Sequence, residues 1–156
     1  LSRLDEQVET RERNATYLAK GFEEIDGVKP LKRDPRVTRW SFYYWNFKYH
    51  EEKFDGIPRD KFLEALRAEG VPCSVGAHGQ PIYHNPLFER TVWDKCPFHR
   101  EDMDYRKVYC PEAERIYQHE AASFPHIIFL GNIDDMNLVL EAIRKIRANT
   151  DELKQH

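Results

Sequence analysis

The chain has 156 residues, of which 40% are hydrophobic and 33% are charged, and its formal net charge at pH 7 is −3. This length is enough for one domain with its own core, and the composition is that of a folded protein and not of a disordered one. The mixed charges give no electrostatic basis for binding nucleic acid or an anionic membrane. The apolar run 127–130 is far too short to span a bilayer, and no basic-then-apolar leader indicates secretion.

The first 25 residues carry apolar side chains at helical spacing. The members of this stripe are Leu4, Val8, Ala15, Leu18, Phe22 and Ile25. They predict one long amphipathic helix that ends at Asp26-Gly27 and Pro30. Residues 29–36 are then expected to be a polar connector.

The segment 39–50, RWSFYYWNFKYH, is the strongest strand signal of the chain. Aromatic residues occupy both alternating faces, so we expect a strand that is buried on both sides or nearly so. An RNA-binding α/β domain is an alternative, because such domains stack bases on strand aromatics. The acidic net charge and the lack of a Lys/Arg-Gly-aromatic-Gly block disfavour it.

Residues 58–70 predict a short helix with a defined start and stop. Pro58 is placed for the first turn, where a missing N–H costs nothing. An apolar face is formed by Phe62, Leu63 and Leu66, and Gly70 is placed to end the helix in a left-handed conformation. We expect a short strand after it, which Gly76 and Gly79 loosen into a loop.

That loop is crowded with hydrogen-bonding side chains, namely His78, Gln80, Tyr83, His84 and Asn85. Two prolines stiffen it, which favours holding a polar ligand over merely joining two elements. The alternative is an ordinary surface loop with ordinary hydrogen bonds. Residues 87–109 have no clean periodicity and are expected to form an ordered, irregular excursion.

The C-terminal third predicts a helix, a strand and a final helix. The first helix starts at Pro111 with Ala113, Ile116 and Tyr117 inward, and the strand covers 124–130. Asn132 is expected to cap the last helix, whose buried stripe is Met136, Val139, Leu140, Ile143 and Ile146. The element order predicts an α/β (α+β) two-layer sandwich, with helices packed on a small, mainly antiparallel or mixed sheet.

Cysteine and histidine residues suggest one further candidate, a metal site. Cys96-x-x-His99, with Cys110 and His119 downstream, matches no standard zinc-finger spacing, so we favour reduced thiols and solvated histidines over a metal. Three cysteines (the third is Cys73) form no disulfide framework, and the reducing cytoplasm is the expected location.

The blocks 58–73 and 81–88 resemble a known family. The matching residues of the first are Arg59, Asp60, Phe62, Ala65, Leu66, Glu69, Gly70, Val71, Pro72 and Cys73, and the second reads PIYHNPLF. A further match runs from CPEAERIYQHEAASFP to LGNIDDMNLVLEAIRKI. Together they resemble the C-terminal domain of the DegT/DnrJ/StrS sugar aminotransferases, nearest the branch acting on scyllo-inosose-type cyclitols.

The resemblance implies the small domain of a fold-type I enzyme that uses pyridoxal phosphate (PLP). It implies that residues 1–156 are a single domain, that the PLP lysine and phosphate cup lie in an N-terminal domain absent here, and that the complete enzyme is a homodimer. The chain starts at Leu1 and not at Met, which agrees with a piece of a longer protein. By itself it is expected to bind no PLP and to be inactive.

The resemblance also implies a substrate and a site. The complete enzyme would move an amino group from glutamine or glutamate to a keto-sugar or keto-cyclitol. The expected substrate-binding residues are His78, Tyr83, His84 and Asn85, although His84 stands where the branch commonly has Arg. The rival hypothesis is a stand-alone α/β module that binds a small ligand or a protein without catalysis.

Overall fold

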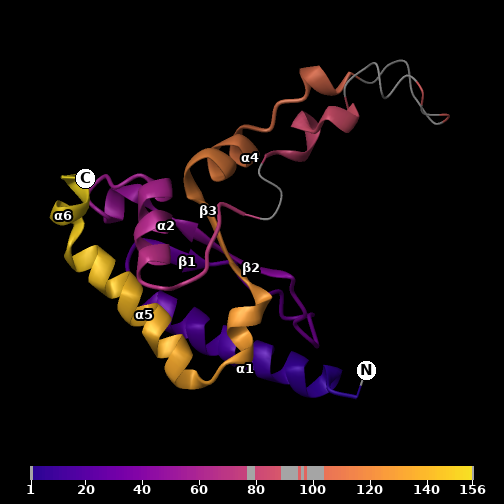
Figure 1. Ribbon diagram of the computed structural model, residues 1–156. Coiled ribbons are helices and arrows are strands. Elements are labelled where there is room, and N and C mark those ends of the chain that lie inside the picture. Colours follow the sequence, from indigo (N-terminus) through magenta and orange to yellow (C-terminus); the bar gives the residue numbers. More distant parts are fainter. Residues whose placement is uncertain (1, 77–79, 89–94, 96, 98–103, 156) are drawn as a thin grey trace.

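The computed structural model describes residues 2–76, 80–88, 95, 97 and 104–155. Within these residues, helices pack on a three-stranded antiparallel sheet of order β1-β2-β3 (Figure 1). The strands are β1 (Val28–Pro30), β2 (Tyr44–Tyr49) and β3 (Ala121–Pro125). The helices are α1 (Leu4–Glu23), α2 (Arg59–Ala68), α4 (Pro111–Arg115), α5 (Ile133–Ala148) and α6 (Thr150–Lys154). The predicted sandwich is confirmed, with antiparallel strand pairing.

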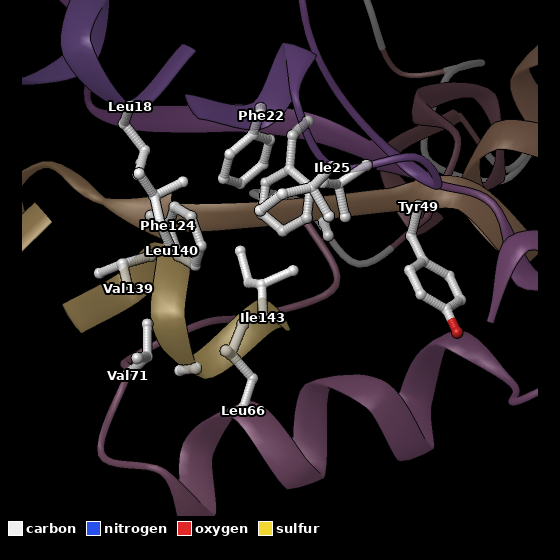
Figure 2. Close-up of a cluster of buried hydrophobic side chains, with 14 of the residues drawn as sticks. Leu18, Phe22, Ile25, Tyr49, Leu66, Val71, Phe124, Val139, Leu140 and Ile143 are labelled. Atoms are coloured by element: carbon white, nitrogen blue, oxygen red, sulfur yellow. The ribbon is translucent and has the colours of Figure 1, made fainter. Parts of the chain in front are cut away.

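The hydrophobic core lies between one face of the sheet and the helices α1, α2 and α5 (Figure 2). Phe22 of α1 makes edge-to-face contacts with Trp45 and Phe47 of β2, with ring centroids 5.3 and 5.2 Å apart. Trp45 also stacks on Phe124 of β3, with ring planes within 5° of parallel. Such aromatic pairs add stabilisation beyond the area they bury, so they fix α1 on the sheet.

Helix α1 follows the predicted stripe over its C-terminal half but not at its start. Ala15, Leu18 and Phe22 are fully buried, whereas Leu4 is half exposed. Val8 of the predicted stripe is partly buried, so burial increases along the helix from its N-terminus. A polar residue, Asn14, lies in the buried face in addition to the predicted ones.

Strand β2 is buried on one side, so the expectation of a strand buried on both sides is wrong. Its burial alternates, with Trp45, Phe47 and Tyr49 in the core and Asn46 exposed on the other face. The strand is also shorter than the aromatic segment and starts at Tyr44. Residues 39–43 lack a partner strand and remain irregular.

Helix α2 behaves as predicted, because Phe62, Leu63 and Leu66 are fully buried. Gly70 has a φ of +86°, and its N–H donates to the carbonyl of Arg67 while the N–H of Val71 donates to that of Leu66. This pair of bonds satisfies the last carbonyls of the helix. The strand expected next is reduced to one antiparallel bridge between Ser74 and Ser123.

The C-terminal elements differ from the prediction mainly in their limits. Strand β3 ends at Pro125, and a 3-10 helix, His126–Leu130, occupies most of the predicted strand. Asn132 caps α5 in a reciprocal capping box with Asp135, and the predicted stripe of α5 is buried throughout. No helix within the described residues is both long and apolar enough to cross a lipid bilayer.

Helix α4 continues into a π-helical turn, Ile116–Glu120. The predicted inward residue Ala113 is exposed, and the buried residues of this region are Glu114 and Glu120. Segments 80–88 and 104–115 lie side by side and project away from the sheet (Figure 1). This projection carries the candidate site.

Candidate functional site

The loop 80–88 is built from two successive 3-10 turns, Ile82–His84 and Pro86–Phe88. Pro81 enters the first turn with a φ of −54°, close to the value its ring imposes. Asn85 separates the turns, and its side-chain oxygen accepts a hydrogen bond from the N–H of Leu87 at 3.0 Å. The short turns and the two prolines give this loop a defined backbone path.

Two of the predicted site residues meet at one carboxylate. Tyr83 donates its hydroxyl proton to Oε1 of Glu114 at 2.6 Å, and Nε2 of His84 lies 3.0 Å from the same oxygen. The hydroxyl of Tyr83 also accepts the main-chain N–H of Cys110 at 3.2 Å. The loop is therefore fastened to the start of α4 by side-chain contacts.

The carboxylate also changes the titration of Tyr83. Its hydrogen bond to Glu114 is the main cause that raises the pKa of the Tyr83 hydroxyl above its ordinary value, and burial adds to the effect. Tyr83 therefore stays a neutral phenol at physiological pH and acts as a donor toward Glu114.

The four predicted substrate-binding residues have different surroundings. Tyr83 and His84 converge on Glu114, while Asn85 bonds within its own turn. His78 lies outside the described residues. Sequence reasoning missed Glu114, because the α4 sequence PEAER has no apolar stripe that would indicate a buried position.

A pocket of about 440 Å³ lies beside this loop, against the open face of β2. Its polar lining side chains are Asn46 and Lys48 from β2 and Gln80 from the start of the loop, and Pro81 lies next to Gln80. The apolar part of the lining includes Val75, Ile116 and Tyr117. A pocket with few polar groups on an apolar wall is the usual form of a small-molecule site.

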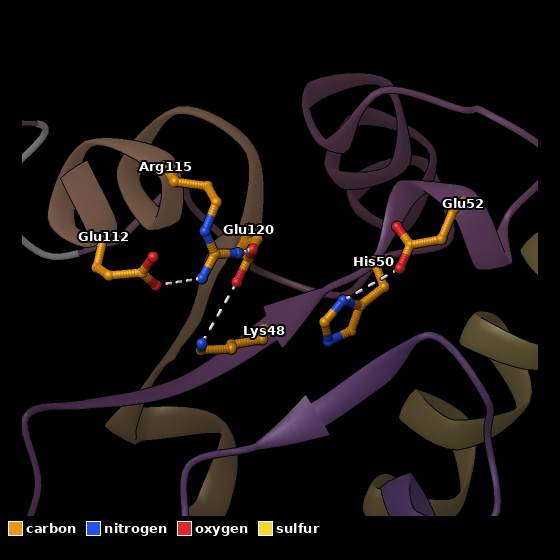
Figure 3. A network of polar contacts seen from close by, with 6 residues as sticks. All are labelled: Lys48, His50, Glu52, Glu112, Arg115 and Glu120. Atoms are coloured by element: carbon orange, nitrogen blue, oxygen red, sulfur yellow. Dashed lines mark hydrogen bonds and ion pairs between the residues drawn. The ribbon is translucent and has the colours of Figure 1, made fainter.

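A second polar network surrounds Glu120, the last residue of the π-helical turn (Figure 3). Glu120 contacts Arg115 and also Nζ of Lys48, which is 3.4 Å from its Oε2, and Arg115 reaches Glu112 at 2.6 Å. The side chain of Glu120 is only 10% exposed, so these cations compensate its charge. The network joins the turn to β2 and so holds the wall of the pocket.

A larger groove of about 550 Å³ runs between α5 and residues 69–72. Lys145 pairs there with Glu69 at 2.8 Å, Asp135 belongs to the capping box, and Glu141 also lines the groove. It shares no lining residue with the pocket beside the loop. The loop pocket is the better candidate site, because it adjoins the loop that carries the predicted residues Tyr83, His84 and Asn85.

The lysines that line the two pockets are both ion-paired in the part of the chain that the structure describes. The lysine that lines the loop pocket, Lys48, is paired with Glu120, and Lys145 of the larger groove is paired with Glu69.

A metal site is not formed by the described residues, since no group of three or more His, Cys, Asp or Glu side chains among them could hold an ion. Cys96 and His99 of the candidate zinc set lie outside the described residues. Cys110 and His119 are exposed.

Residues 1–144 match the model of the DegT/DnrJ/EryC1/StrS aminotransferase family. The chain belongs to this family. The resemblance noted from the sequence blocks is thereby confirmed.

Similar proteins include aminotransferases with related names. A Micromonospora echinospora protein, provisionally named L-glutamine:3-amino-2,3-dideoxy-scyllo-inosose aminotransferase, is 36% identical over 99% of this chain and 38% of its own length. The L-glutamine:2-deoxy-scyllo-inosose aminotransferase of Streptoalloteichus tenebrarius is 29% identical over 99% of this chain and 36% of its own length.

A solved structure has the same fold. It is 3-amino-5-hydroxybenzoic acid (AHBA) synthase, with a TM-score of 0.70 and 26% identity over 94% of this chain and 36% of that chain. The DegT-family chain thus spans less than two fifths of the length of the proteins it matches.

Proposed function

We propose that residues 1–156 are the C-terminal domain of a PLP-dependent aminotransferase that transfers an amino group from glutamine or glutamate to a keto-cyclitol or keto-sugar. One observation carries the proposal. The relatives whose names specify glutamine and an inosose match this chain over nearly all of its length, and not over a single block.

This domain would supply one wall of the substrate pocket. The loop that carries His78, Tyr83, His84 and Asn85 would form that wall, next to the polar groups of Asn46. A polyhydroxylated ring offers both donors and acceptors, and amide and imidazole groups can pair with either. The PLP lysine and the phosphate cup would come from the rest of the protein.

The complete enzyme would be a cytoplasmic homodimer, with part of the dimer contact on this domain. The free thiols of Cys73 and Cys110 support a reducing compartment. Size-exclusion chromatography with light scattering would give the mass of the complete protein. A monomer at micromolar concentration would contradict the homodimer.

The activity is tested with the complete enzyme, L-glutamine and three ketones, namely scyllo-inosose, 2-deoxy-scyllo-inosose and a keto-sugar. Mass spectrometry should detect the amine of at least one cyclitol. Amination of the keto-sugar alone would move the substrate class to sugars, and no amine from any ketone would contradict the proposal. A native protein of 18.6 kDa in the source cell would favour the stand-alone binding module instead.

The division of labour is tested with the 156-residue chain and PLP. We expect no borohydride-stable PLP–lysine adduct at a defined site, because the aldimine lysine and the phosphate cup would lie in the N-terminal domain. The complete enzyme is the positive control. A stoichiometric adduct at one lysine of the isolated chain would contradict the proposal.

A further inference from the structure

Glu114 is a carboxylate with only 8% of its surface exposed. A buried carboxylate is costly unless donors compensate its charge. Two side chains of the 3-10 turn Ile82–His84 contact the oxygen Oε1 of Glu114: Tyr83 donates a hydrogen bond to it, and Nε2 of His84 lies 3.0 Å away. One atom of α4 thus fixes two consecutive side chains of the loop.

The hydrogen-bonding capacity of Tyr83 is nearly used up by this arrangement. A phenol has one proton to donate, and Tyr83 donates it to Glu114. One lone pair accepts the N–H of Cys110. While these bonds persist, Tyr83 has no proton to donate to a substrate hydroxyl. We therefore expect Tyr83 to affect substrate binding through the position of the loop.

The loop in turn places one edge of the neighbouring pocket. Gln80 and Pro81 line the pocket, and the side-chain amide of Gln80 donates to the carbonyl of His84 at 3.3 Å. A shift of the turn away from Glu114 would therefore move Gln80 relative to Asn46 on β2 across the pocket.

We infer that Glu114 is a positioning residue, which braces the loop 80–88 against α4 through Tyr83 and His84 and so sets the width of the pocket between the loop and β2. The part of this inference that concerns a substrate rests on the proposed aminotransferase function. It assigns Tyr83 and His84 to the brace and leaves Gln80 and Asn46 as the side chains that face the pocket.

The brace itself is tested by amide hydrogen exchange in the 156-residue chain. Glu114→Gln keeps the size of the side chain but removes its charge, and charge-assisted hydrogen bonds are about twice as strong as neutral ones. We expect exchange of the Cys110 and loop 80–88 amides to speed up about tenfold in Glu114→Gln and in Tyr83→Phe. The matched control is Glu112→Gln on the same helix, whose side chain is 77% exposed.

The result that overturns the brace is unchanged loop exchange in Glu114→Gln, or an equal change in Glu112→Gln. Circular dichroism and thermal unfolding of each variant establish that the chain is folded. If Glu114→Gln does not fold, Tyr83→Phe and His84→Leu, which remove the two contacts to Glu114 one at a time, decide the same question.

The role at the pocket is tested by a double-mutant cycle in the complete enzyme. If Tyr83 acts through Glu114, Tyr83→Phe and Glu114→Gln each lower kcat/KM, mainly by raising KM for the ketone. The kcat/KM of the double variant is then within about twofold of that of the less active single variant. The visible spectrum of the bound cofactor is unchanged. Effects that multiply would show that Tyr83 contacts the substrate by itself and would overturn the positioning role.

The hydrogen-exchange experiment and the double-mutant cycle together separate this inference from the proposed function. A wild-type enzyme that aminates no ketone contradicts the proposed function, while the exchange experiment still decides whether Glu114 holds the loop. If the enzyme is active and the effects of the two substitutions on kcat/KM multiply, the positioning role is contradicted and the proposed function is unaffected.

Discussion

The side-chain amide of Asn14 donates a hydrogen bond to the main-chain carbonyl of Phe129 at 3.0 Å, although the two residues are 115 positions apart in the chain. The same amide donates to the carbonyl of Gly131 at 2.8 Å. Asn14 is fully buried, and its amide satisfies two carbonyls at the C-terminal end of the 3-10 helix His126–Leu130, where helical hydrogen bonding stops. This pair ties α1 to the segment that leads into α5.

Replacing Asn14 by Ala should destabilise the chain by about 1–3 kcal/mol, because buried carbonyls would lose their donor. Urea denaturation followed by circular dichroism measures the free energy of unfolding. Asn137→Ala is the matched control, since the hydrogen bond from Tyr17 to Asn137 is exposed. It should change stability by less than about 0.5 kcal/mol. Equal costs for the two variants would contradict the role given to Asn14.

Replacing Ile143 by Ala should cost about 2–5 kcal/mol, because the side chain is fully buried between α5 and the rest of the core (Figure 2). Leu138 lies on the same helix but is 61% exposed, so Leu138→Ala serves as the control. The midpoint of thermal unfolding should fall clearly for the first variant only. A cost below about 0.5 kcal/mol for Ile143→Ala would mean that the buried face of α5 is assigned wrongly.

The elements predicted well are those that their own residues determine. The stripe of α5, its cap at Asn132 and the left-handed stop at Gly70 depend on local spacing and backbone preference. Each of these was found where the sequence placed it.

The residues at which the strands begin and end depend instead on the neighbouring strands. The pairing of the strands cannot be predicted from the sequence. In the register of the sheet, Tyr44 lies opposite Pro125, and Pro30 lies opposite Phe47. Strand β1 ends at Pro30 and β3 ends at Pro125, and proline cannot donate to the strand ladder. After Pro125 the chain enters the 3-10 helix His126–Leu130, although the N–H of His126 still donates to the carbonyl of Tyr43 at 3.1 Å. The aromatic residues before Tyr44 therefore have no partner strand, which explains why the predicted strand was too long.

The candidate site was only partly predicted, because its contacts also depend on residues distant in the sequence. The polar loop could be located from its composition, but its partner Glu114 could not. Burial of a glutamate depends on donors that fold against it, and Tyr83 is 31 residues away in the sequence. Which side chains meet there follows only from the arrangement of the loop on α4.

The cysteines should differ in reactivity. Burial raises the pKa of the Cys73 thiol, which also lies 3.4 Å from the carbonyl of Leu63, whereas Cys110 is exposed. Since the thiolate is the reactive form, iodoacetamide at pH 8 should modify Cys110 at least about tenfold faster than Cys73. Peptide mass mapping measures both rates. In 8 M urea (roughly full unfolding) the difference should vanish, and faster labelling of Cys73 in the folded chain would contradict the prediction.

Asp104 gives a prediction on pH. Its pKa is lowered from 3.8 to about 2, chiefly by the hydrogen bond from the side chain of Arg106. Because the folded-state pKa lies below the unfolded one, the contribution of this group to stability is present above about pH 4 and is lost as the pH falls toward 2. Arg106→Gln should return the pKa of Asp104 toward 3.8.

A carboxyl-detected NMR titration measures that change and carries its own control. Asp34 and Arg36 repeat the same spacing and the same bonds, and Arg36 lowers the pKa of Asp34 in the same way. The Arg106→Gln variant should therefore leave the titration of Asp34 unchanged. A pKa of Asp104 that stays near 2 without Arg106 would show that another group holds the carboxylate, and the turn Tyr105–Lys107 would then have a different origin of stability.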